Sequence, residues 1–174
     1  MTGRQKVGRN AGYALLAVVL WFLLYLFAWR GMRFFLIPSE SMEPTLLKSD
    51  YIITLNYGHP PQDPERFDVI VFKDVEDPTA YAVKRVIGLP GEEIAIHDGA
   101  VFIDGEYLSE PYVPERPVYT YEPQVVPEDE YFVLGDNRNR SSDSSLWRRS
   151  VPREDIIGRA VLIYNPVQRM GRIR

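Results

Sequence analysis

The sequence of 174 residues contains no cysteine. This absence excludes disulfide bonds, zinc sites built on thiolates and any cysteine nucleophile. Histidine is nearly absent too, since the chain holds only His59 and His97. His59 stands in a proline-rich stretch and His97 directly precedes an Asp-Gly pair, so both are expected to be surface turn residues. A catalytic triad of serine, histidine and aspartate is therefore not predicted.

Basic charge is not in excess. The 24 acidic residues outnumber the 20 lysines and arginines and give a formal net charge of −4. Nucleic-acid-binding proteins usually carry a basic surplus, so no nucleic-acid partner is predicted. The chain also shows no cluster with metal-ligand spacing and no glycine-rich phosphate loop. We therefore expect neither a metal ion nor an organic cofactor.

Charge is missing altogether from residues 11–29, which read AGYALLAVVLWFLLYLFAW. A helix of this length spans about 29 Å, close to the hydrocarbon thickness of a bilayer. A buried core helix rarely lacks charge on every face, and a cleaved signal peptide ends in small residues that are absent here. The run therefore predicts a retained transmembrane anchor over 11–29.

Basic residues flank this run unequally. They are Arg4, Lys6 and Arg9 on the amino-terminal side and Arg30 and Arg33 on the other side. Positive charge favours the cytoplasmic face of a membrane, although a bias of three against two is small. Residues 1–10 are therefore predicted to be a cytoplasmic basic amino-terminus, and residues 30–174 an extracytoplasmic domain.

Beyond the run, short apolar segments alternate with turn residues. They predict strands at 51–55, 67–72, 81–87, 93–97, 100–103, 131–134 and 156–164. Asp98-Gly99 between two such segments is a strong hairpin signal. Residues 109–129 hold five prolines and are expected to be extended. The predicted fold is mostly β: a folded antiparallel sheet or barrel-like catalytic domain behind one amino-terminal transmembrane helix.

Serine and lysine remain as a candidate nucleophile and base. Two serines stand between prolines in IPSESMEPTL at 37–46, a segment stiff enough to fix a nucleophile. In the predicted strand, Lys84 shares a face with Ala82 and Val86. Burial in such an apolar row would disfavour the charged amine and leave a base able to accept a proton. From the pattern alone, a Ser/Pro linker and a lysine that reaches solvent remain open alternatives.

Four sequence boxes follow the apolar run. They read IPSESMEPTL at 37–46, RFDVIVFK at 66–73, KRVIGLPGE at 84–92 and GDNRNRSSDSS at 135–145. In composition and order they resemble the boxes of the bacterial type I signal peptidases, and the resemblance runs from about residue 11 to about residue 164. It implies endoproteolytic removal of signal peptides from exported preproteins at Ala-x-Ala-type sites, through an acyl-enzyme. It also implies residence in the bacterial plasma membrane, with membrane-bound preproteins and the lipid bilayer as partners.

The resemblance assigns the reacting groups. Ser41 would be the acylating nucleophile, and Lys84 would take its proton and later activate the deacylating water. The Ser39 hydroxyl would stabilise the oxyanion together with the Ser41 N–H, and Ser141 would orient Lys84. Residues implied to line shallow pockets for small substrate side chains are Ile37, Pro38, Met42 and Val83.

The resemblance also implies supporting residues. Asp136 and Arg85 would form an ion pair, and Asp143 would support the last of the four boxes, residues 135–145 (the late box). The family has an arginine after its Asp-Ser pair, whereas this chain has Ser145. One of the arginines at 148–149 is therefore a candidate replacement partner for Asp143.

Two other functions are weighed against a signal peptidase. One is a related Ser/Lys protease that matures pilin-like or conjugative substrates or cuts itself, although no DNA-binding helix pair of a self-cleaving repressor is visible. The other is an anchored module that holds signal peptides without cutting them. Intact Ser41 and Lys84 disfavour that module, while the departures at Arg140 and Ser145 leave it open.

Overall fold

The computed structural model describes residues 3–57, 62–77 and 79–173. Helix α1 covers Gly3–Arg30, and within it side chains are described for residues 12–25. His59 lies outside the described residues. The other described residues form two antiparallel sheets, where the sequence predicted one folded or barrel-like sheet, with four short helical segments between the strands.

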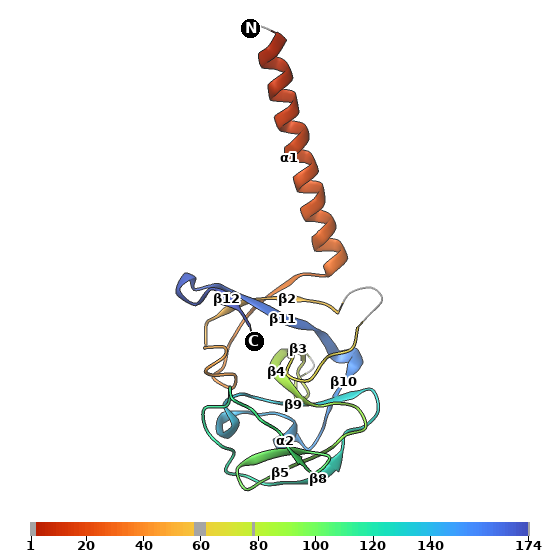
Figure 1. Ribbon diagram of the computed structural model, residues 1–174, viewed down its shortest axis with the longest axis vertical. Coiled ribbons are helices and arrows are strands. Elements are labelled where there is room, and N and C mark those ends of the chain that lie inside the picture. The colour runs from red at the N-terminus through yellow and green to blue at the C-terminus, as the bar shows by residue number, and fades with distance from the viewer. Residues whose placement is uncertain (1–2, 58–61, 78, 174) are drawn as a thin grey trace.

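Helix α1 extends away from the β-strands, and its carboxyl end is the part that lies nearest to them (Figure 1). Its described apolar side chains, among them Leu15, Trp21 and Leu24, are exposed. Within the described part of the chain, no helix is both long enough and apolar enough to cross a membrane. The anchor predicted over 11–29 includes positions whose side chains lie outside those described, and it stays a prediction.

The larger sheet has eight strands in the order β1-β2-β11-β3-β4-β9-β10, with β12 paired to β11. Their bounds are β1 Arg33–Leu36, β2 Tyr51–Leu55, β3 Val69–Lys73, β4 Tyr81–Gly88, β9 Glu130–Leu134, β10 Val151–Pro152, β11 Ile156–Asn165 and β12 Gly171–Arg172. Every pair is antiparallel, and β11 carries register shifts against both β2 and β3. Strand β4 lies inside this sheet between β3 and β9, so Lys84 is not on an edge strand.

The smaller sheet has four strands in the order β7-β6-β5-β8 and lies at the end of the molecule far from α1 (Figure 1). Its strands are β5 Glu93–His97, β6 Ala100–Ile103, β7 Glu106–Tyr107 and β8 Tyr121–Val125. The predicted hairpin joins β5 to β6, and both Asp98 and Gly99 adopt positive φ there. Strand β8 was expected only as extended chain, because Pro123 interrupts its sequence pattern; β8 is an edge strand, where a missing N–H is tolerated.

Buried apolar side chains of the described residues gather in three clusters. The first joins the 37–50 segment to the larger sheet. The second joins the smaller sheet to residues of β4 and β9, and the third is built on β3, β4 and β9. The short helical segments are η1 Arg138–Arg140, α2 Ser144–Trp147, η2 Arg153–Asp155 and η3 Val167–Arg169. Segment η1 lies within the late box, and α2 begins in it. The late box itself directly follows β9 in the chain.

Candidate active site

The two residues predicted to react lie against each other. A hydrogen bond of 2.9 Å joins Lys84 Nζ to Ser41 Oγ, and Ser39 Oγ lies 3.2 Å from Ser41 Oγ. Lys84 comes from the middle of β4, whereas both serines come from the turn segment after β1. Ser41 and Lys84 are each only 6% exposed. The arrangement therefore brings a serine hydroxyl and a lysine amine together in a largely buried site.

The surroundings of Lys84 are apolar, as the strand pattern predicts. Ala82 and Val86 are buried on β4, and buried Ile70 is the register partner of Lys84 on β3. Burial lowers the pKa of the Lys84 amine, while the charges of Asp143 and Asp74 act in the opposite direction. The site thus favours the neutral amine, which is the form that can accept a proton.

The lowered pKa of Lys84 makes folding stability depend on pH. Between the folded pKa and the unfolded value of about 10.4, the unfolded chain binds a proton that the folded chain does not. Stability therefore rises with pH through this window, and the cost of burying Lys84 is greatest below it. Lys84→Met removes the titrating group and keeps an apolar side chain of similar length.

Lys84→Met is therefore expected to be more stable than the wild type at pH 6, with a difference that shrinks as pH approaches 10. The measurement is the urea midpoint of both full-length proteins in the same detergent at several pH values. A difference that stays constant over this range would show that Lys84 titrates normally.

Gly135, directly after β9, allows the segment that carries Ser41 to come close to the backbone there. A Cβ at this position would overlap the Ser41 carbonyl oxygen and the Ser141 side chain. The Ser41 carbonyl also accepts a hydrogen bond from the Asn137 N–H at 3.1 Å. Close backbone contact with residues 135–137 therefore helps to fix the position of Ser41.

Gly135→Ala is expected to slow any reaction in which the Ser41 hydroxyl attacks by about 100-fold, since a displacement of about 1 Å at a reacting atom can cost that much. Gly171→Ala is the matched control, because the nearest atom to an added Cβ there is 3.9 Å away. Initial rates of both variants, measured after circular dichroism has shown each to be folded, make the comparison. Equal rates for Gly135→Ala and the wild type would contradict the role of this close approach.

Ser141 lies beside Ser41 but does not make the expected contact. Its hydroxyl is buried and has no hydrogen-bond partner among the described residues. Lys84 Nζ instead bonds to Ser41 Oγ and to the Val83 carbonyl at 3.1 Å. The role of Ser141 in orienting Lys84 therefore stays a prediction.

Asp136 and Arg85 form the expected ion pair. Arg85 donates from Nε at 2.8 Å and from Nη2 at 2.7 Å to the two Asp136 oxygens, and both side chains are almost fully buried. Arg85 also donates to the Phe67 carbonyl at 2.9 Å, and the Thr45 hydroxyl donates to Asp136. This bidentate pair links β4 to the late box and to the nucleophile segment.

Asp143 does not pair with an arginine at 148–149. Its carboxylate accepts hydrogen bonds from the Gly135 N–H at 3.0 Å, the Ser145 N–H at 3.2 Å and the Ser145 hydroxyl at 2.7 Å. Arg148 instead lies over the ring of Tyr121. Asp143 caps α2, and Ser145, which replaces the family's arginine, satisfies it locally.

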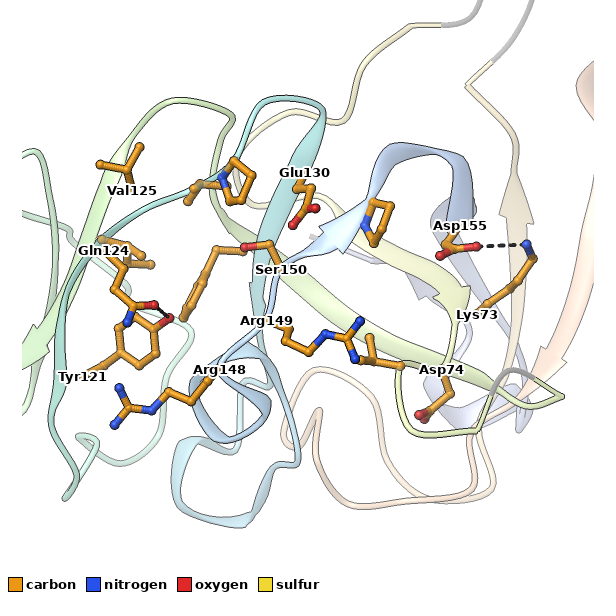
Figure 2. Close-up of a pocket in the computed structure, with 16 residues that line it drawn as sticks. Lys73, Asp74, Tyr121, Gln124, Val125, Glu130, Arg148, Arg149, Ser150 and Asp155 are labelled. Atoms are coloured by element: carbon orange, nitrogen blue, oxygen red, sulfur yellow. Dashed lines mark hydrogen bonds and ion pairs between the residues drawn. The ribbon is translucent and has the colours of Figure 1, made fainter.

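The predicted substrate-pocket residues divide by burial. Ile37, Met42 and Val83 are buried in one core cluster beside Ser41, whereas Pro38 is exposed. Their lining of substrate pockets stays a prediction. A separate cavity of about 560 Å³ lies between β8 and the Ser150–Pro152 segment, as Figure 2 shows. Neither Ser41 nor Lys84 lines this cavity.

Sequence reasoning missed a buried pair next to the late box. Arg138 donates to the Gly135 carbonyl at 3.1 Å and binds the Glu110 carboxylate through both terminal nitrogens. The Tyr112 hydroxyl donates to the Glu110 carboxylate at 2.6 Å, and the Arg85 guanidinium carbon lies 4.1 Å from the centroid of the Tyr112 ring. Arg138 stands inside GDNR and could have been suspected, but Glu110 lies in the proline-rich stretch with no local signal.

Known proteins resemble this chain in sequence and in fold. A family model described as "Signal peptidase, peptidase S26" matches residues 9–165. The chain belongs to the signal peptidase family. Membership in this family places the chain among serine endopeptidases. The matched residues include all four boxes, Ser41 and Lys84.

Two curated relatives from cyanobacteria are similar to this signal peptidase chain. It is 45% identical over 144 residues to "Signal peptidase I" of Leptolyngbya laminosa, which covers 79% of the chain and 70% of the relative. It is 44% identical over 140 residues to "Probable signal peptidase I-2" of Synechocystis sp., which covers 78% of the chain and 64% of that relative. The second match thus spans just under two thirds of the relative's length.

A solved structure supports the same family at the level of fold. The crystal structure of a signal peptidase I from Enterococcus faecalis superposes with a TM-score of 0.51 at 34% identity. The superposition covers 56% of this signal peptidase chain and 97% of the solved one. The mostly β architecture predicted from the sequence is therefore confirmed.

Proposed function

We propose that this chain is a membrane-anchored signal peptidase I that removes signal peptides from exported preproteins at Ala-x-Ala-type sites. The observation that carries the proposal is the buried contact of 2.9 Å between Lys84 Nζ and Ser41 Oγ, with Ser39 Oγ at 3.2 Å from the same atom. The names of the two cyanobacterial relatives agree with this activity. Such a dyad requires no metal ion or organic cofactor.

Acylation begins with a neutral Lys84 amine. As the Ser41 oxygen attacks the carbonyl carbon of the scissile peptide, its proton passes to Lys84 Nζ. The resulting ammonium then protonates the leaving amine as the C–N bond breaks. The signal peptide's carboxyl-terminal carbonyl is left as an ester on Ser41, and the mature protein departs with a free amino-terminus.

Deacylation uses the same two residues. A water molecule gives its proton to the Lys84 amine and attacks the ester carbonyl, and the ammonium returns that proton to the Ser41 oxygen as the C–O bond breaks. Signal peptide with a free carboxylate is released, and both side chains regain their starting forms. Since Lys84 must be neutral at the start of both steps, the burial that lowers its pKa serves each of them.

The oxyanion of both steps requires hydrogen-bond donors that stand in place beforehand. We assign this role to the Ser39 hydroxyl and the Ser41 N–H. Ser39 is exposed, and its Oγ is close to the attacking oxygen. No acceptor for the Ser41 N–H occurs among the described residues. Both groups are therefore available to a substrate carbonyl.

Attachment to the plasma membrane is supported by the sequence of 11–29 and by the exposed apolar side chains of α1. The aromatic ring of Tyr164 on β11 contacts those of Phe34 on β1, the strand that follows α1, and of Tyr51 on β2. In the proposed topology, residues 1–10 are cytoplasmic and residues 30–174 lie outside, where preproteins emerge from the bilayer.

Because the chain lacks cysteine, Thr2→Cys and Ser109→Cys can each be labelled from one side with an impermeant maleimide. Labelling of Thr2→Cys from outside would reverse this topology.

Cleavage of a preprotein with an Ala-x-Ala site, in detergent micelles, tests the proposed activity. The product masses locate the cut, which is expected directly after the second alanine. Binding without cutting by the wild type would instead favour a module that only holds signal peptides. A reproducible cut at a different type of site would favour another Ser/Lys protease.

A further inference from the structure

The segment that carries both serines is closed at its base by a buried carboxylate. In this nucleophile loop, residues 37–50, Ile37 N–H donates to the Asp50 carbonyl at 2.9 Å and Ser49 N–H donates to the Ile37 carbonyl at 2.8 Å. The Asp50 side chain accepts the Leu47 N–H at 2.8 Å and is 2% exposed. A carboxylate so far from water needs a cationic partner to remain charged without a large cost.

Arg169 supplies that cation from near the carboxyl end of the chain. Its Nε lies 3.0 and 3.1 Å from the two Asp50 oxygens, and its Nη2 lies 2.9 Å from Oδ2. The same Nη2 donates to the Thr45 carbonyl at 3.2 Å. One guanidinium therefore holds both the base and the middle of the nucleophile loop.

The position of Arg169 is itself determined by the return of the chain after β11. Arg169 ends η3, and β12 then pairs back on β11 at Ile163 and Leu162. Ile173 N–H donates to the Val161 carbonyl, and the Ile173 side chain packs against the cluster that contains Ile37 and Met42. Arg169, β12 and Ile173 all come after residue 165, where the match to the family model ends.

The nucleophile loop is held on its other side by the late box. Thr45 donates its hydroxyl to Asp136, the partner of Arg85, and the Ser41 carbonyl accepts the Asn137 N–H. Thr45 is thus bound through its side chain to the late box and through its carbonyl to Arg169. The loop lies between these two attachments, and Ser41 is within it.

We propose that Arg169 is a positioning residue for peptide-bond cleavage, which keeps Ser41 against Lys84 by binding Asp50 and the Thr45 carbonyl. This inference rests on the proposed function, because it concerns the same Ser41 and Lys84. Arg169 contacts neither of them and acts through the nucleophile loop. Loss of its guanidinium leaves Asp50 buried without its cation, so the loop shifts to bring water to the carboxylate. Ser41 then moves relative to Lys84.

The first test is steady-state cleavage of the Ala-x-Ala preprotein by full-length variants in micelles. Arg169→Ala is expected to lower kcat by about 10- to 100-fold, with KM changed by less than about threefold, because a shift of about 1 Å at the nucleophile is enough. Arg169→Lys should fall between Arg169→Ala and the wild type, since a single ammonium cannot bridge Asp50 and Thr45 as a fork does. Arg172→Ala, an exposed arginine three residues on, should match the wild type.

A double variant identifies the route through Asp50. If Arg169 acts by neutralising Asp50, Arg169→Ala should cost much less in Asp50→Asn than in the wild-type chain. Urea midpoints measured at several temperatures identify a temperature at which every variant is folded, and the kinetics are compared at that temperature. If Arg169→Ala has the wild-type kcat at that temperature, Arg169 contributes only to stability and the proposal is overturned.

A second readout does not depend on any substrate. Acetylation of the Lys84 amine, followed by mass spectrometry as a function of pH, reports its pKa and its access to solvent. Arg169→Ala should move the Lys84 profile toward that of an ordinary lysine, while Arg172→Ala should leave it in place. If the wild type cleaves nothing but this shift occurs, the proposed activity fails and the positioning role stands. An unchanged profile together with unchanged kcat would refute the positioning role.

Discussion

Ser41→Ala is expected to abolish cleavage of an Ala-x-Ala preprotein, with a fall in kcat of about 10⁴-fold or more. The change removes the one oxygen that lies 2.9 Å from Lys84 Nζ, so no acyl-enzyme can form. Losses of this size follow removal of the nucleophile in other serine hydrolases, where only binding and the oxyanion site remain. The fold should survive, because a hydroxyl is replaced by hydrogen at a site where the Ser41 backbone makes the packing contacts.

Ser109→Ala is the matched control for this change, since Ser109 is an exposed serine in the proline-rich stretch. It should cleave at the wild-type rate. Mass spectrometry of the products and a substrate-binding measurement should show that Ser41→Ala still binds the preprotein. Cleavage at the same bond by Ser41→Ala, at more than about one hundredth of the wild-type rate, would remove Ser41 from the nucleophile's role.

Lys84→Met is expected to reduce kcat by a similar factor, because the nucleophile then lacks a base within reach. Losses of nucleophile and base are not additive in such pairs, so Ser41→Ala combined with Lys84→Met should be no slower than either alone. In the wild type, the rate should rise with pH through the Lys84 pKa, which burial places below the ordinary lysine value of about 10.4. The acidic limb of kcat/KM should therefore lie well below that value.

Lys48→Met provides the control for this change, because Lys48 is an exposed lysine in the nucleophile loop itself. Its rate and pH profile should equal those of the wild type. An acidic limb near the value of an ordinary lysine would mean that Lys84 is not the base. A limb that persists unchanged in residual activity of Lys84→Met would lead to the same conclusion.

Features that repeat over a few neighbouring residues could be predicted from the sequence. The strands at 51–55 and 93–97 have the expected bounds, since alternation and turn residues act locally. Strand β8 was missed because Pro123 breaks the local pattern, and pairing with β5 decided it instead. Strand β1 was missed because it is only four residues long and begins at Arg33, shortly after the apolar run ends at Trp29.

The partner of Asp143 illustrates the limit of carrying a family pattern across by position. The family's arginine is Ser145 here, and a replacement among the arginines at 148–149 was expected from charge alone. The structure shows that Asp143 caps α2 and is satisfied by the Ser145 hydroxyl and two backbone N–H groups. Whether a carboxylate needs a cation depends on the number of donors that the fold directs at it.

The sequence by itself indicated the family, the order of the boxes and the two side chains proposed to react, because these reside in short runs of residues. The tertiary structure alone decided that Lys84 and Ser41, 43 positions apart, meet at 2.9 Å in a buried site. It also decided that Arg138 binds Glu110 and that Arg169 binds Asp50. Such contacts join distant segments and depend on how sheets pack, and packing leaves no periodic trace in the sequence around either partner.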